Sequence, residues 1–191
     1  MYSDFVTLKF SKHSFTFLIA AQAISASLLA HMKRQGKPTY WLHGLILTLA
    51  TGFTGGFIAP LFMNQLPMPL QNDFILPFVA IAWYTTTYLG GAKFWTNNKI
   101  ANSILLTLVA LFRTHAVMRF TMKASLIFQP NKYESCAIIR PIFIGTLLAS
   151  AGLFIPQRGD GYGSIEVETP WTLQSAFITS SFTHIMLNDK T

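Results

Sequence analysis

Charged side chains are scarce in this sequence of 191 residues: they make up 11% of it, where an ordinary soluble domain has about 25%. A water-soluble globule of this size must cover its surface with polar side chains, and this composition does not supply enough of them. The scarcity excludes a disordered chain, a fibrous repeat and a typical cytosolic enzyme. The presence of a single cysteine, Cys136, excludes a disulfide scaffold and a cysteine zinc site.

Acidic residues are especially few, with seven Asp and Glu against 14 Lys and Arg, for a net charge of +7. Hydrophobic residues, by contrast, reach 51%, and the mean hydropathy is +0.42. These values indicate a polytopic membrane protein. On such a protein an excess of positive charge is typical of contact with anionic lipid headgroups rather than nucleic acid. We therefore expect membrane lipids as partners, and no nucleic acid.

Charge-free stretches predict where the chain crosses the membrane. An apolar stretch of about 20 residues spans the bilayer as a helix, and charges are costly inside it. Lys12 and Lys33 bracket the first stretch, and the interfacial aromatic pair Tyr40-Trp41 begins the second. We expect six helices, with both termini on the same side of the membrane. They cover 13–32, 40–62, 74–88, 100 to the stop at Gln129-Pro130, 141–155 and 171–187. Pro77 lies in the first turn of the third.

Small residues recur in the second and fifth of these stretches. Gly145, Ala149 and Gly152 in the fifth echo Gly52 and Gly56 in the second. This echo is consistent with an internal duplication, and repeats of three spans each insert with opposite topology. The expected fold is all-α: a polytopic membrane helix bundle of six transmembrane helices in two inverted three-helix repeats. It forms a single membrane domain over 1–191, with repeat one at about 13–90 and repeat two at about 100–187.

The second stretch has two interpretations. Gly52, Gly55 and Gly56 let another helix approach closely, and Gly52 and Gly56 share a face. Pro60 has no N–H, so it leaves the carbonyl of Gly56 without its helical partner. The first interpretation is a broken helix lining a cation path, because a freed carbonyl needs protein, water or an ion. The second, a close-packed and kinked helix, is the commoner case in membrane proteins.

The fourth stretch carries cations. His115, Arg119 and Lys123 follow at steps of four and form one stripe on a helix. They are candidates to bind an anionic phospholipid headgroup or to line a hydrated cavity, although side chains at the end of a span also simply reach toward water. Arg113 lies deeper and on another face, and we expect a structural or pore role for it.

No catalytic signature is present, since no nucleophile motif and no paired acids lie on one face. We therefore do not expect an enzyme. A haem needs two imidazoles that face one another, whereas His13, His31, His43 and His184 lie at the ends of spans, where histidine is common. We expect no metal and no cofactor, apart from an anionic phospholipid bound at the stripe of the fourth stretch.

Taken in order, these motifs resemble the trimeric intracellular cation channels, and the resemblance covers most of residues 13–187. It implies two inverted three-helix repeats, a seventh helix, a homotrimer and a phosphoinositide contact in the fourth helix. Phe53–Ala59 is similar to the family's Phe-Gly-Gly-Gly-Ile-type motif, and His115–Arg119 takes the place of its Lys-Glu-Val-x-Arg motif. The other matching segments are His13-Ser14 with Ala20-Ala21-Gln22, Trp83-Tyr84, Ile144-Gly145-Thr146 and Gly152–Ile155.

The sequence also departs from that family. His115 and Ala116 replace the motif's Lys and Glu, and Leu147-Leu148-Ala149 stands where the family tends to have a basic residue and more glycine. No seventh helix follows before Thr191. Because a conduction path needs polar groups that replace ion hydration, Leu148 and Ala116 argue against conduction.

Two functions follow as expectations. The first is an accessory structural subunit with a channel-like fold in a multi-subunit organellar complex, favoured in the respiratory complexes of the mitochondrial inner membrane. Before Asp73 there are five basic residues and one acid, Asp4, a bias that fits mitochondrial import. The alternative is a homotrimeric monovalent cation channel of an intracellular membrane such as the endoplasmic reticulum. In that channel Gly55 and Gly56 open the second helix, and an anionic lipid at Arg119 regulates it.

Overall fold

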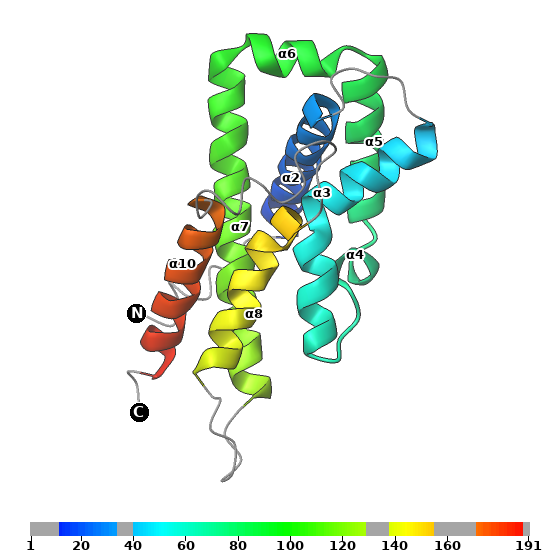
Figure 1. The fold of residues 1–191 in the computed structure, drawn as a ribbon. Helices are drawn as coiled ribbons and strands as arrows, with labels where there is room; N and C mark the ends of the chain where they lie inside the picture. Colours follow the sequence, from blue (N-terminus) through cyan, green and yellow to red (C-terminus); the bar gives the residue numbers. More distant parts are fainter. Residues whose placement is uncertain (1–11, 34–39, 129–137, 155–170, 189–191) are drawn as a thin grey trace. The chain divides into compact units, whose positions relative to one another are not determined.

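The computed structural model describes residues 12–33, 40–128, 138–154 and 171–188, and every regular element in these ranges is a helix (Figure 1). The expected all-helical class is therefore confirmed for the described residues. In chain order the elements are α2 (Lys12–Lys33), α3 (Trp41–Phe62), α4 (Met68–Gln71), α5 (Ile75–Tyr88), α6 (Gly91–Asn97), α7 (Lys99–Ile127), α8 (Ile139–Ser150), the 3-10 helix η1 (Ala151–Phe154) and α10 (Trp171–Asn188).

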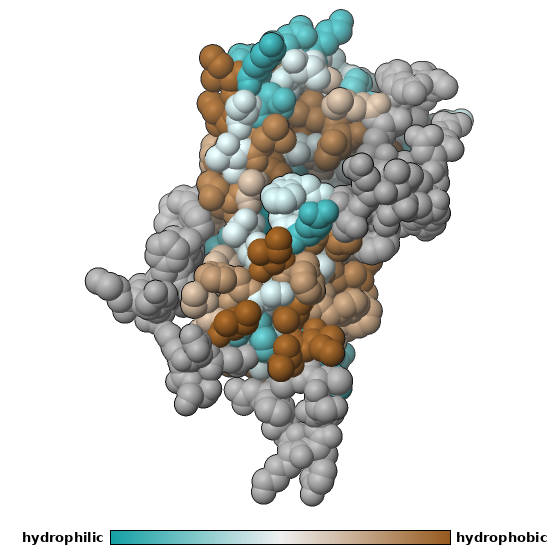
Figure 2. Space-filling model, turned by 60° about the vertical axis from the view of Figure 1, so that its left-hand side comes forward, coloured by the Kyte–Doolittle hydropathy of each residue, from teal (hydrophilic) through white to brown (hydrophobic). Residues whose placement is uncertain are grey.

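In the part of the chain that the structure describes, three helices are long and apolar enough to cross a membrane: α2 through Phe15–Met32, α3 through Trp41–Phe62 and α7 through Lys99–Ile127. The apolar stretch of 18 residues is only 33% buried in α3 and 28% buried in α7. Their apolar side chains therefore face outward, as lipid-facing side chains do. Figure 2 shows hydrophobic side chains over much of the coloured surface on the face that it presents. Helix length, composition and surface together indicate a membrane protein with transmembrane helices.

The helix ends differ from expectation in three places. The segments after Asn64 and after Leu89, expected as connections, contain the short helices α4 and α6. The α-helical part of α8 ends at Ser150 and passes into η1, whereas the expected end at Ile155 lies outside the described residues. Pro77 and Pro141 are each the third residue of their helices, where an N–H has no intrahelical partner and its loss costs little.

The chain divides into two compact units. The first unit contains the described parts of Met1–Gly52 and Asn72–Phe112, and the second unit those of Phe53–Gln71 and Arg113–Thr191. Residues of α3 and of α7 belong to both units, so this division differs from the expected division into repeats. The expected repeats stay a prediction.

In the first unit, α2 packs along α5. Small side chains cover the buried face of α2, so the two backbones approach closely. Ser27, fully buried on α2, donates a hydrogen bond of 3.1 Å to the carbonyl of Ala82 on α5. The short helix α6 crosses from the end of α5 to the start of α7 (Figure 1). A buried cluster secures it to its neighbours: Ala21, Leu28, Ala92 and Leu105, with Ile24, Trp95 and Leu108 against them.

In the second unit, α8 packs along α10. Its buried cluster contains residues of α3, α7 and α8 together with Met63. Phe62 and Phe143 meet edge to face beside it, with ring centroids 5.9 Å apart. The cluster members are Ala59, Met63, Phe120, Ala124 and Ile144, with Met68, Phe128 and Leu148 packed against them.

Candidate functional site

The glycines of α3 contact three different elements. A Cβ added to Gly52 would lie 2.5 Å from the Cβ of Ala26 on α2, and Gln22 of α2 donates a hydrogen bond of 2.9 Å to the Gly52 carbonyl. A Cβ on Gly55 would lie 1.6 Å from the backbone oxygen of Leu148 on α8. A Cβ on Gly56 would lie 3.3 Å from the Cβ of Met68 at the start of α4. Although Gly52 and Gly56 are one turn apart, they do not serve one common neighbour.

Pro60 does not interrupt α3. It is fully buried and lies two residues before the helix ends at Phe62. Its own carbonyl accepts hydrogen bonds from the N–H groups of Met63, at 2.9 Å, and Gln65, at 3.0 Å, which close the last turn. The helix is therefore continuous through the glycines, which agrees with the second interpretation, a close-packed helix, rather than with a broken one.

A line of hydroxyl groups lies inside the second unit, and we name it the hydroxyl seam: Thr121 of α7, Thr146 and Ser150 of α8, and Ser180 of α10. Thr146 and Ser180 form a hydrogen bond of 3.1 Å between their hydroxyl groups. Ser150 donates to the Thr146 carbonyl at 2.6 Å. The hydroxyl of Thr121 is buried and has no hydrogen-bond partner among the described residues.

Gly145 makes room for this seam. A Cβ on Gly145 would lie 2.2 Å from the hydroxyl oxygen of Thr121 and 2.8 Å from the Cβ of Ser180. The predicted packing role of Gly145 thus has specific partners on α7 and α10. Gly152, predicted with it, is half-buried in η1. The spacing of small residues predicts Gly145 but not Thr121 or Ser180, because nothing in the local spacing of these two separates them from the many other hydroxyl residues.

The basic stripe lies on one continuous helix, as its spacing predicted. Arg119 is exposed, while His115 and Lys123 are half-buried. Arg113 is half-buried as well and forms no ion pair within the described ranges. Six of the seven acidic residues lie outside those ranges, Asp73 being the exception. The stripe is thus available to anionic groups at Arg119, and lipid binding there stays a prediction.

Of the histidines whose side chains the structure describes, His31 and His43 belong to the first unit and His115 and His184 to the second. His43 is exposed and His31 is half-buried on different helices of the first unit. His184 is 5% exposed and lies near the end of α10, so its neighbours in the second unit cover it, and its expected place at the membrane interface stays a prediction. Among the described residues, no group of three or more His, Cys, Asp or Glu is placed to hold a metal ion.

No protein-family model matches the chain, and no curated protein and no solved structure matches it. The likeness to the trimeric intracellular cation channels therefore rests on the sequence motifs alone.

Proposed function

We propose that the chain is a non-catalytic integral membrane protein that serves as an accessory structural subunit of a multi-subunit organellar complex. Its fold in this proposal is channel-like, with six spans in two inverted repeats. The favoured location is the inner mitochondrial membrane, in a respiratory complex. The acid-poor N-terminal third of the sequence supports this location.

The contact between Gly55 and Leu148 carries the proposal. Gly55 lies in the segment that resembles a channel motif, yet its open side is filled by the backbone of α8. Backbone packed against backbone leaves no space for an ion and its ligands at that point. The glycine therefore acts as a packing residue, which favours a structural role.

The same contact supports the inverted repeats. In two repeats of three helices, α3 is the second helix of one and α8 is the second helix of the other. Equivalent helices of two such repeats contact one another where they lie at the two-fold axis in the membrane plane. Gly55 of α3 against Leu148 of α8 is a contact of this kind.

The remaining spans of the six are shorter. α10 has 18 residues, or about 27 Å of helix at 1.5 Å per residue, close to the bilayer core of about 30 Å. α5 has 14 residues and α8 has 12, with η1 directly after it. Short helices of this kind cross a membrane when aromatic and charged residues at their ends reach the interface, a role that we propose for the exposed Tyr84 and Tyr88 of α5.

Native purification tests the structural role. The chain carries an affinity tag, is expressed at its natural level and is extracted in mild detergent, and its partners are identified by mass spectrometry. We expect constant stoichiometry with other organellar membrane subunits, in a particle much larger than three copies of this chain. Recovery as a homotrimer alone would contradict the proposal.

A second candidate function is the lipid-regulated cation channel, and two observations favour it. Arg119 is exposed on α7, and the hydroxyl seam places polar groups inside the second unit. Purified chain in planar bilayers is the test. If the chain is such a channel, we expect a monovalent cation current that depends on anionic lipid. Arg119→Ala should abolish this current, and Lys123→Ala should reduce it less. Absence of current from pure homotrimer would argue against this candidate.

A further inference from the structure

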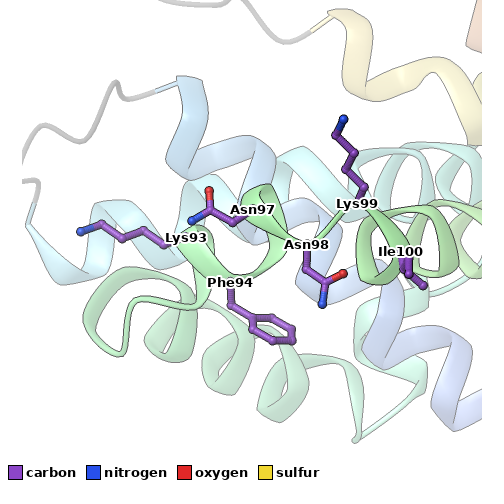
Figure 3. Close-up of a pocket in the computed structure, with 6 residues that line it drawn as sticks. All are labelled: Lys93, Phe94, Asn97, Asn98, Lys99 and Ile100. Carbon is purple, nitrogen blue, oxygen red and sulfur yellow. The ribbon is translucent and has the colours of Figure 1, made fainter.

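A basic corner lies where α6 meets α7 in the first unit, and we name it the basic elbow: Lys93, Phe94, Asn97, Asn98, Lys99 and Ile100. These residues line an open depression of about 710 Å³ (Figure 3). Neither the motifs discussed above nor the proposed functions use this corner.

The elbow has two chemically different sides. In Figure 3 the side chains of Asn97 and Lys99 extend from one side of the backbone and those of Phe94 and Asn98 from the other, while Lys93 points away along α6. Phe94 is 57% exposed and Ile100 is 74% exposed. An element with a cation on one side and a bare apolar group on the other matches the boundary between headgroups and acyl chains.

The position of the elbow agrees with that boundary. Lys99 is the first residue of the membrane-length helix α7, so the elbow lies at the end of a span. Phe94 and Trp95 meet edge to face with centroids 5.4 Å apart, and such aromatic residues are enriched where membrane meets water. Beyond the elbow, Ile104 and Leu111 are exposed on α7 at helical spacing from Ile100, which gives an acyl chain an apolar surface to follow.

The charge of the elbow is uncompensated within the described residues. Both lysines are exposed, and neither forms an ion pair there. Asp73, the one described acid, lies before α5, and the elbow begins after α5. The 14 residues of α5, about 21 Å of helix, therefore separate Asp73 from the elbow. Salt screens charges over about 8 Å at physiological ionic strength, so Asp73 does not neutralise the elbow.

Asparagine side chains supply hydrogen-bond groups beside the lysines. Asn98 accepts a hydrogen bond of 3.2 Å from the N–H of Ala101 through its Oδ1, which caps the start of α7. The amide groups of Asn97 and Asn98 still have N–H donors for phosphate oxygens. Ammonium and amide N–H groups are the kinds of donor that a phosphodiester anion binds.

We propose that the basic elbow binds the headgroup of an anionic phospholipid, with an acyl chain along Ile100, Ile104 and Leu111. This site differs from the stripe at Arg119 and does not depend on either proposed function. The occupant is a bilayer lipid rather than an acidic protein segment, because the apolar side of the elbow continues into the exposed surface of α7.

Tryptophan quenching tests the proposal in reconstituted full-length chain. Trp41, Trp83 and Trp171 are replaced by Phe, so that Trp95 remains as the reporter inside α6. Brominated phosphatidylglycerol and brominated phosphatidylcholine are compared in mixed vesicles. We expect phosphatidylglycerol to quench preferentially, and the preference to fall about fivefold for each lysine removed in Lys93→Gln and Lys99→Gln.

Two variants make the test specific. Lys93→Arg with Lys99→Arg preserves the charge and should retain the preference. Arg119→Gln with Lys123→Gln removes the same charge elsewhere and should leave the preference at Trp95 unchanged. Equal quenching of Trp95 by both lipids would overturn the proposal. So would an equal fall of the phosphatidylglycerol preference in the two Gln double variants. If the reporter variant does not fold, native mass spectrometry counts the phosphatidylglycerol retained by the wild type and by the Lys93→Gln with Lys99→Gln variant. Fewer retained lipids in this variant would support the proposal, and an equal number would overturn it.

Discussion

Gly55 of α3 and Leu148 of α8 touch backbone to backbone: a Cβ on Gly55 would lie 1.6 Å from the Leu148 carbonyl oxygen. Real side chains never come that close, and the obstacle is main chain rather than a flexible side-chain end. Packing in the second unit therefore requires glycine at position 55. At the next residue, a Cβ added to Gly56 would lie 3.3 Å from the Cβ of Met68, which is tight but not a clash with main chain.

The first prediction compares these neighbours. Gly55→Ala should destabilise the chain by about 3 kcal/mol, the upper end for overpacking, because the two helices must separate. Gly56→Ala should be nearly neutral, since the helix-stabilising effect of alanine, about 1 kcal/mol, offsets a small shift of Met68. Thermal unfolding in detergent, followed by fluorescence-detected size exclusion, measures both. Equal stability of the two variants would contradict the assigned contact.

The second prediction concerns Gly145 and the hydroxyl seam. Gly145→Ala should cost about 1–3 kcal/mol, because its Cβ meets Thr121 and Ser180. Thr121→Ala alone should cost little, since the hydroxyl it removes is buried without a hydrogen-bond partner among the described residues.

The double variant of this pair should recover part of the loss, with a coupling of about 0.5–3 kcal/mol in a double-mutant cycle. Recovery is partial because the Cβ of Ser180 stays 2.8 Å from the new methyl group. Strictly additive costs would show that the two residues do not meet. Unfolding midpoints of the four proteins are sufficient for the cycle.

The third prediction tests the packing of the first unit. Ser27→Ala should destabilise by about 1 kcal/mol, because it removes a buried hydrogen bond between α2 and the Ala82 carbonyl of α5. Thr107→Ala is the control: its exposed hydroxyl bonds only to the Ser103 carbonyl of its own helix, and its loss should change stability by less than about 0.5 kcal/mol. Denaturant titration of both proteins distinguishes these outcomes.

The fourth prediction distinguishes six spans from three. Six crossings place the first and last residues on the same side of the membrane, whereas α2, α3 and α7 alone would place them on opposite sides. Epitope tags at the two termini in sealed organellar vesicles should therefore be digested together or protected together. Digestion of one tag with protection of the other would rule out the six-span arrangement.

Charge placement predicted most helix positions. Lys12 and Lys33 stand at the two ends of α2, and Trp41 begins α3, as expected from the sequence. The reason is physical: an ionised group and an interfacial ring both mark where hydrocarbon ends. The spacing of His115, Arg119 and Lys123 on α7 was predictable for the same reason, since a long apolar stretch has to be helical in a membrane.

Tertiary contacts decide what the sequence did not reveal. α4 and α6 are too short to be stable alone, and each is held by neighbours: Pro69 of α4 is buried, and Ala92 of α6 belongs to a core cluster. The different partners of Gly52, Gly55 and Gly56 follow from which helices lie around α3, and one helix's periodicity does not contain that information. The same holds for the burial of His184, which faces its neighbours in the second unit.

The sharing of α3 and α7 between the two units has a consequence for biosynthesis. The first unit is completed by Asn72–Phe112. The Phe53–Gln71 segment belongs to the second unit, whose other residues begin only at Arg113. Phe53–Gln71 therefore leaves the ribosome well before its neighbours and must wait in the lipid, with Gly55 uncovered, until α8 is made. An insertase or chaperone that shields a glycine-bearing helix during that interval would shorten the period in which the chain can mispair.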